Sequence, residues 1–194
     1  MIRLALLRHG HTPWNRAGRI PGRTDIPLDD EARDHLRAFS LPPGWTVAEV
    51  VDSPLSRAMD TGKLVTGRTP HAEPALMEMN WGDWEGAQGV TLKADPASGF
   101  RDIEDWGWDY CPPGGEAPGD LRARLEPWAM GLKRDTVAIC HIGVMRVLMA
   151  IATDWNFDGP APFAIKRDRL FVIRIDGKNW EADATPERLI KAAP

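Results

Sequence analysis

Three short apolar runs, each followed by a polar cluster and then by a helical segment, constrain the fold of this chain most. The runs span residues 2–7, 48–52 and 136–140, and we interpret them as strands. Helical patterns follow them at about 29–39, 54–66 and 142–152. Strands that alternate with helices predict an α/β fold, a three-layer α/β/α sandwich around a mainly parallel sheet. We expect one domain over residues 1–194.

Local signals place several boundaries of these elements. Asp29 precedes an acidic first helical turn, and Ser53-Pro54 has the pattern of an N-cap followed by proline at the first helical position. Gly67 is expected to end that helix. A further helix is predicted over residues 121–132 and a strand over 169–175, and Asp176-Gly177 favours a hairpin turn after it. The last ten residues are expected to be loosely held.

Residues 71–118 interrupt the alternation with many glycines and prolines. The slightly longer span 71–120 carries 2 basic and 11 acidic side chains, a net charge of −9, and four of the nine tryptophans lie within it. We expect an irregular, lid-like excursion with short helices, one of them at about 96–105. An aromatic and acidic lid favours a substrate with one phosphate and a flat, neutral or cationic leaving group.

Composition excludes several classes of function. The net charge of −4 argues against a nucleic-acid platform. No apolar run is long enough for a membrane span or a signal peptide, and Cys111 and Cys140 form no CxxC pair. Two unpaired cysteines fit a reducing compartment, so we expect a cytoplasmic protein, a monomer or homodimer, without nucleic-acid or membrane partners.

Each of the three parallel-strand candidates ends in residues that carry chemistry. Arg8-His9 follows the first run, the segment 53–57 with Arg57 follows the second, and His141 follows the third. Carboxyl ends of parallel strands meet at one edge of a sheet, so two imidazoles and two guanidiniums should share one pocket. Guanidinium groups match phosphate oxygens, and a histidine among cations keeps a lone pair that can attack phosphorus. The sequence therefore predicts phosphoryl transfer, which also needs a carboxylic acid to protonate the leaving group.

Five motifs in order over residues 1–150 carry a resemblance to a known family. They are Leu7-Arg8-His9-Gly10 through Trp14-Asn15, the loop from Gly18-Arg19 to Pro27-Leu28, Ser53-Pro54-Leu55-Ser56-Arg57-Ala58 with Thr61, Leu76 through Trp84-Glu85-Gly86 together with Pro113-Gly114-Gly115-Glu116, and His141 with Gly143, Val144 and Arg146. This pattern resembles the histidine phosphatase superfamily, which has a phosphoglycerate-mutase-like fold. The compact chain is similar to the bacterial phosphatase branch of that superfamily.

The resemblance implies a role for each reacting group. His9 would be the nucleophile that forms a transient phosphohistidine, and Glu78 would be the proton donor and then the base. Arg8 and Arg57 would clamp the phosphoryl oxygens, and His141 would stabilise the transition state. The residues implied in substrate binding are Arg8, Gly10, His11, Asn15, Gly22, Arg57 and His141. No metal and no organic cofactor is implied.

Four positions depart from the family pattern and leave the substrate open. His11 stands where the mutases have Glu, Pro21 where a polar side chain often binds phosphate, Ala117 where Ser is common, and Ile142 where Gly is usual. The short chain and the acidic middle segment favour a phosphomonoesterase acting on a small phosphorylated metabolite. A phosphoglycerate-mutase-type phosphotransferase is the alternative. A non-catalytic regulator that binds a phosphate ligand is a third reading.

Overall fold

A six-stranded mixed sheet forms the centre of the molecule, and the computed structural model describes residues 1–192. Its strand order is β3-β4-β1-β5-β6, with β7 paired to β5. The parallel strands are β1 (Ile2–Arg8), β3 (Glu49–Asp52) and β4 (Thr136–Cys140). The antiparallel additions are β5 (Arg169–Asp176), β6 (Asn179–Ala182) and β7 (Glu187–Arg188). The three predicted parallel strands are confirmed, as is the predicted hairpin between β5 and β6.

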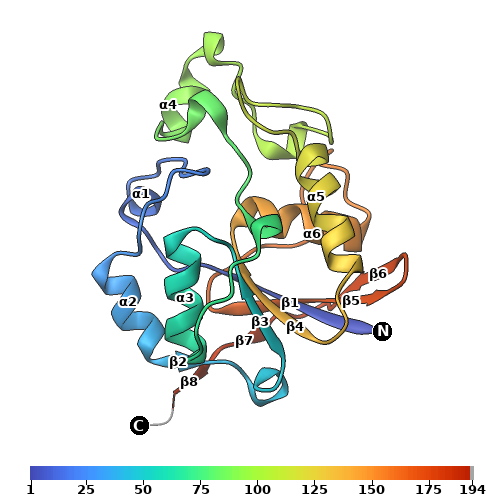
Figure 1. Cartoon of the computed structure of the whole chain (residues 1–194). Helices are drawn as coiled ribbons and strands as arrows, with labels where there is room; N and C mark the ends of the chain where they lie inside the picture. The colour runs from blue at the N-terminus through green and yellow to red at the C-terminus, as the bar shows by residue number, and fades with distance from the viewer. Residues whose placement is uncertain (193–194) are drawn as a thin grey trace.

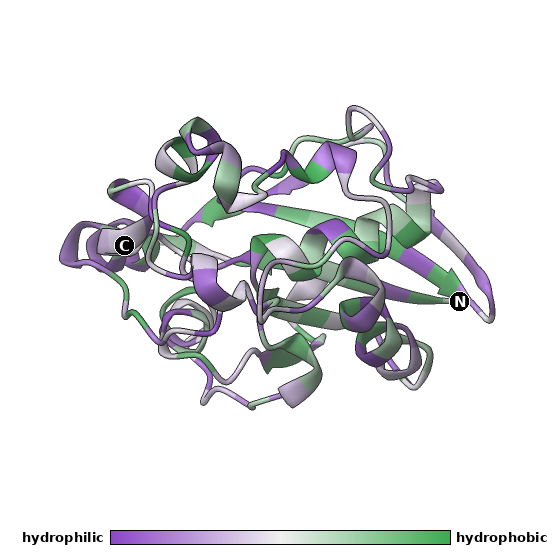
Figure 2. Ribbon diagram, turned by 90° about the horizontal axis from the view of Figure 1, so that it is seen from above, coloured by the Kyte–Doolittle hydropathy of each residue, from purple (hydrophilic) through white to green (hydrophobic). Residues whose placement is uncertain are grey.

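Helices cover both faces of this sheet (Figures 1 and 2). Helices α2 (Asp30–Arg37) and α3 (Ser56–Thr66) pack on one face, and α5 (Pro118–Met130) and α6 (Ile142–Thr153) on the other. Alternate residues of β1 belong to the two hydrophobic cores, one on each face of the sheet. Ala5 and Leu7 lie in the core under α2 and α3, and Leu4 and Leu6 lie in the core under α5 and α6. The predicted three-layer α/β sandwich is confirmed. Within residues 1–192, no helix is long and apolar enough to cross a membrane.

Helix α3 begins later than the sequence predicted. Its first residue is Ser56, and its N-cap, Leu55, makes no side-chain capping bond. The hydroxyl of the predicted cap, Ser53, accepts from the Leu55 amide at 3.4 Å and makes a 2.6 Å hydrogen bond with His141. Ser53 therefore belongs to the turn before the helix and contacts a buried imidazole at the same time. Gly67, with φ of 67°, ends the helix as predicted.

The segment 71–118 consists of short elements separated by turns. They are the 3₁₀ turns Pro74–Leu76, Gly82–Trp84, Pro96–Ser98 and Ile103–Asp105, and the short helix α4 (Gly89–Ala94). The single helix predicted at 96–105 is wrong, because Gly99 takes the left-handed conformation and separates two 3₁₀ turns. A bridge between Arg19 and Gln88 ties this segment to the loop after helix α1 (Pro13–Arg16).

Three of the four tryptophans in this segment are packing residues. Trp81, Trp84 and Trp106 are buried, with ring centroids 5.3–6.4 Å apart. The fourth, Trp108, packs edge-on against Phe157 at 5.0 Å. The rings therefore stabilise the segment against the body of the protein, and of these four tryptophans Trp81 also lines the cavity beside Glu78.

The C-terminal residues are held more firmly than predicted. Strand β7 pairs with β5, and β8 (Ile190–Lys191) pairs with β2 (Phe39–Ser40). Backbone pairing of this kind satisfies amide and carbonyl groups that a loose tail leaves to water. The expectation of a loose end is thus wrong for residues 187–191, and residues 193–194 lie outside the described part of the chain.

Candidate active site

The predicted polar clusters meet at one edge of the sheet. His9 follows β1, His141 follows β4, and Arg57 is the second residue of α3 after β3. The two imidazole centroids lie 5.0 Å apart, and the Arg57 Nε lies 3.3 Å from His141 Nδ1. All three side chains are buried. The gathering expected from parallel strand ends is therefore present.

His9 is held in one tautomer by its own loop. Its backbone amide donates to the Cys140 carbonyl at 3.0 Å, and its Nδ1 lies 2.6 Å from the Gly10 carbonyl. A carbonyl only accepts, so Nδ1 carries the proton and Nε2 keeps its lone pair. Burial, followed by the charges of Arg57 and Arg8, lowers the pKa of His9 well below its ordinary value. The ring is therefore neutral and able to act as a nucleophile.

His141 is held between an arginine and a serine. Arg57 Nε donates to its Nδ1, so the neutral ring carries its proton on Nε2 and donates it to the Ser53 hydroxyl at 2.6 Å. Burial and then the neighbouring His9 and Arg57 lower its pKa well below the ordinary value. Sequence reasoning missed Ser53 as a site residue, because its place before Pro54 has the pattern of a helix cap.

Backbone carbonyls, not carboxylates, hold Arg57. Its two terminal nitrogens donate to the carbonyls of Gly22 (2.7 Å) and Thr24 (2.9 Å). The guanidinium therefore has hydrogen-bond partners, but no carboxylate of residues 1–192 lies within ion-pair distance of it. Gly22, predicted in substrate binding, is placed here to orient Arg57. It has φ of 49°, and a Cβ would lie 1.9 Å from Glu85 Oε1.

Glu78 is buried beside the start of α6. One carboxylate oxygen accepts from the Met79 amide at 2.8 Å and the other from the Gly143 amide at 3.2 Å. Burial raises the pKa of Glu78 despite these two hydrogen bonds. A raised pKa favours the protonated form, which is the form a general acid needs. Gly143 is required for this contact, because a Cβ there would lie 2.4 Å from Glu78 Oε1.

Arg8, Asn15 and Arg167 lie together at the mouth of the site. Arg8 has a buried Nε without a hydrogen-bond partner, and burial and the charge of Arg167 lower its pKa to about 9. Asn15 Oδ1 accepts from the Thr12 amide at 3.2 Å and from Arg167 Nη2 at 3.1 Å. Since both bonds occupy the oxygen, the amide nitrogen of Asn15 is the group left to donate to a ligand.

The remaining predicted binding residues differ in their surroundings. The Gly10 amide donates to the Thr61 hydroxyl at 3.0 Å, so this amide already has an acceptor. A Cβ at Gly10 would lie 2.8 Å from Leu36, which explains the glycine by packing against α2. His11 is half-buried, and burial and then the charges of Arg167 and Arg16 lower its pKa. His11 lines both cavities that open at this edge of the sheet.

Arg167 was not found from the sequence. It precedes β5, which runs antiparallel to β1, and Leu170 pairs with Leu7. The beginning of β5 therefore lies beside the end of β1, and Arg167 reaches the His9 carbonyl with its Nε at 3.1 Å. The rule that sites form at the carboxyl ends of parallel strands does not cover residues that precede an antiparallel strand.

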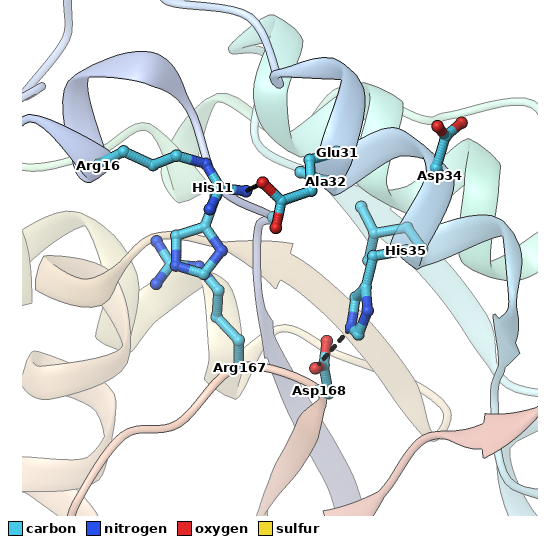
Figure 3. Close-up of a pocket in the computed structure, with 10 residues that line it drawn as sticks. His11, Arg16, Glu31, Ala32, Asp34, His35, Arg167 and Asp168 are labelled. Atoms are coloured by element: carbon cyan, nitrogen blue, oxygen red, sulfur yellow. Dashed lines mark hydrogen bonds and ion pairs between the residues drawn. The ribbon is translucent and has the colours of Figure 1, made fainter.

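Two cavities open at this edge of the sheet. The first, about 300 Å³, is lined by Arg8, His11, Asn15, Glu78, Trp81 and Arg167 among others. The second, about 490 Å³, runs along α2 and shares His11 and Arg167 with the first (Figure 3). Of the acids of segment 71–118, only Glu78 lines the first cavity. Within residues 1–192, no group of three or more histidine, cysteine or acidic side chains has the arrangement of a metal site.

Comparisons with known proteins identify the family of this chain. The sequence model of the histidine phosphatase superfamily (branch 1) matches residues 4–187. A glucosyl-3-phosphoglycerate phosphatase of Mycobacterium tuberculosis is 31% identical over 166 residues, which cover 76% of this chain and 74% of the relative. The structure of a mycobacterial glucosyl-3-phosphoglycerate phosphatase in complex with VO3 has a TM-score of 0.80 at 27% identity, with 94% and 98% coverage. A phosphoglycerate mutase from Thermus thermophilus has a TM-score of 0.70 at 30% identity, and the match covers 100% of each chain.

Proposed function

Because this chain belongs to the histidine phosphatase superfamily, we propose that it is a phosphomonoesterase that hydrolyses a small phosphate ester through a phosphohistidine on His9. The observation that carries the proposal is the state of His9. Its Nδ1 is bonded to the Gly10 carbonyl, so the lone pair is on Nε2, next to guanidiniums that lack carboxylate partners. This combination supports attack on a phosphoryl group.

The reaction has two steps, and the same residues serve both. His9 Nε2 attacks phosphorus, the bond from phosphorus to the ester oxygen breaks, and the Glu78 proton passes to the leaving oxygen. Water then attacks the phosphohistidine, Glu78 takes a proton from that water, and the N–P bond breaks to release phosphate. Arg8 and Arg57 bind the phosphoryl oxygens throughout, with the Asn15 amide nitrogen as a further donor.

His141 responds to the charge of the ligand in this proposal. A bound phosphoryl dianion favours protonation of His141, which turns Nδ1 from an acceptor into a donor. His141 then stabilises the charge on the transferring group, and Ser53 keeps the ring oriented. The segment 71–118 acts as a cover on the site through Trp81 and Glu78, within a single domain.

A mutase is the second candidate, favoured by the likeness to the Thermus thermophilus phosphoglycerate mutase. A mutase returns the phosphoryl group to an organic hydroxyl, whereas a phosphatase passes it to water. Release of inorganic phosphate therefore separates the two activities. We expect phosphate release, without interconversion of 2- and 3-phosphoglycerate.

The test compares two histidine variants on p-nitrophenyl phosphate. His9→Ala is expected to abolish hydrolysis, with a fall of at least about a thousandfold, because it removes the nucleophile. His71→Ala is the matched control, since His71 is exposed and lies outside both cavities. Full activity of His9→Ala would contradict the proposal, and so would an inactive wild-type protein across a panel of phosphorylated metabolites.

A further inference from the structure

Arg167 lies next to His9, and its guanidinium makes no ion pair within residues 1–192. It donates to the His9 carbonyl and to Asn15 Oδ1, both neutral acceptors, at 3.1 Å each. Within the described residues, no carboxylate lies within ion-pair distance of it. Its side chain is partly buried, so water compensates its charge less than at an open surface.

This charge is more than one phosphoryl group needs. A phosphate monoester carries up to two negative charges, which Arg8 and Arg57 match. A protonated Glu78, which its raised pKa favours, adds no negative charge. Arg167 adds positive charge beyond Arg8 and Arg57, and it lowers the pKa values of Arg8, His9 and His11. A ligand with a further negative charge balances this excess.

The two cavities indicate where the additional negative charge of the ligand binds. His11 and Arg167 line both the 300 Å³ cavity that contains Glu78 and the 490 Å³ cavity along α2 (Figure 3). The other charged groups of the second cavity already have partners. Arg16 pairs with Asp29 and Glu31, Asp34 pairs with Arg37, and Asp168 accepts a hydrogen bond from His35 Nε2 at 2.9 Å. His11 and Arg167 are therefore the groups that line both cavities and remain available to a ligand.

The acidic residues of segment 71–118 do not oppose an anion here. Glu85 accepts from the backbone amides of Arg23 and Thr24, and Glu116 pairs with Arg23 and Arg124. These carboxylates bind the loop and α5, and they do not line either cavity. The neutral or cationic leaving group expected from the sequence therefore loses its electrostatic basis.

We propose that Arg167 and His11 form a second anion subsite, which binds an acidic group, a carboxylate or a second phosphate, on the leaving-group side of the substrate. The inference rests on the proposed phosphatase function, since it names the class of ester that this site accepts. Arg167 donates to the acidic group through its free nitrogen while its other two nitrogens stay on His9 and Asn15. The substrate is thus a phosphate ester of an organic acid or of a second phosphate.

Two matched ligand pairs test the subsite by calorimetry in a His9→Ala background, where no ester is consumed. 3-Phosphoglycerate and glycerol 3-phosphate differ in a carboxylate against a hydroxymethyl group. Propane-1,3-diol bisphosphate and 3-hydroxypropyl phosphate differ in a second phosphate. We expect one acidic member to bind about 10- to 100-fold more tightly than its neutral partner, the range of a charge-assisted hydrogen bond. The pair that shows the preference identifies the acidic group.

Variants then assign the preference to Arg167. Arg167→Gln should remove it, and the matched control Lys166→Gln, an exposed neighbour of equal charge, should keep it. His11→Glu, at a half-buried position, should reverse the preference by like-charge repulsion, and it serves as the test if Arg167→Gln does not fold. Equal affinity within both pairs overturns the inference. So does an equal loss for both members in Arg167→Gln, which would make Arg167 only a positioning residue.

Failure of this inference and failure of the proposed function give different results. An active phosphatase with no preference within either pair contradicts the subsite alone. Absence of hydrolysis and of a phosphohistidine in the wild-type protein contradicts the proposed function, while the affinities remain measurable. A preference that Arg167→Gln removes supports the subsite in either case.

Discussion

Removal of the Ser53 hydroxyl tests how His141 is oriented. In Ser53→Ala the Nε2–H of the fully buried His141 ring loses its acceptor at 2.6 Å. The bond from Arg57 Nε to Nδ1 of the same ring remains. An unsatisfied buried donor costs about 1–3 kcal/mol, so the free energy of unfolding should fall by that amount. The ring also loses one of the two side-chain hydrogen bonds that fix its orientation. If about 1.4 kcal/mol of that bond holds the productive orientation, kcat falls about tenfold.

The assay is steady-state hydrolysis of p-nitrophenyl phosphate, with chemical denaturation to measure stability. We expect kcat to fall while KM changes little, because Arg8, Arg57 and Asn15 still bind the phosphoryl group. Ser56→Ala is the matched control: its hydroxyl also makes one hydrogen bond, to Asp25 at 2.8 Å, but at a position that is only half-buried. It should leave kcat within about twofold. A folded Ser53→Ala with wild-type kcat would refute the role of Ser53.

Three further predictions concern Glu78, the pH profile and a buried carboxyl. Gly143→Ala places a Cβ 2.4 Å from Glu78 Oε1, so kcat should fall at least about tenfold without loss of the fold; wild-type kcat would contradict the contact. The lowered pKa of His9 and the raised pKa of Glu78 predict that kcat/KM stays high below about pH 6.5 and falls as Glu78 loses its proton; an acid limb near pH 6.5 would contradict this. Burial raises the pKa of Asp52 to about 7 in the folded state, so its stability contribution is full below the unfolded pKa of 3.8 and is lost as pH rises through about 7. Asp52→Asn should therefore gain stability relative to wild type between these pH values, by up to about 1.4 kcal/mol per pH unit, and a difference independent of pH in denaturation would contradict the burial argument.

The layered fold could be predicted because its signals are local. The buried runs of β1, β3 and β4 are short and almost wholly apolar, and helical segments separate them along the chain. Capping by Asp29 and the left-handed Gly67 gave boundaries that agree with α2 and α3 within a residue or two. These signals can be read within each segment, although the strands that they predict pair with distant ones, as Leu4 does with Thr136.

Contacts between distant positions explain the errors. Ser53 satisfies a helix-cap pattern, but its hydroxyl also binds a buried imidazole 88 positions later. The tryptophans of segment 71–118 satisfy the composition of a lid, but tertiary packing buries Trp84 and Trp106 among other rings. No periodicity within a segment reveals contacts between such distant positions.

The site residues that follow parallel strands could be predicted from the sequence. The residue that precedes an antiparallel strand could not. His9, Arg57 and His141 come together because β1, β3 and β4 are parallel. Arg167 comes from the beginning of β5, whose direction no sequence signal indicated. The leaving-group side of the site therefore became visible only with the sheet topology.

The measurement that tests the central claim most directly is the mass of the enzyme during turnover. The reaction is quenched in alkali, where a phosphohistidine survives, and the intact protein and its peptides are analysed by mass spectrometry. We predict one added phosphoryl group, located on the peptide that contains His9 and absent from His9→Ala but present in His71→Ala. Rapid phosphate release with no phosphorylated intermediate, or a phosphoryl group on a different residue, would contradict the account.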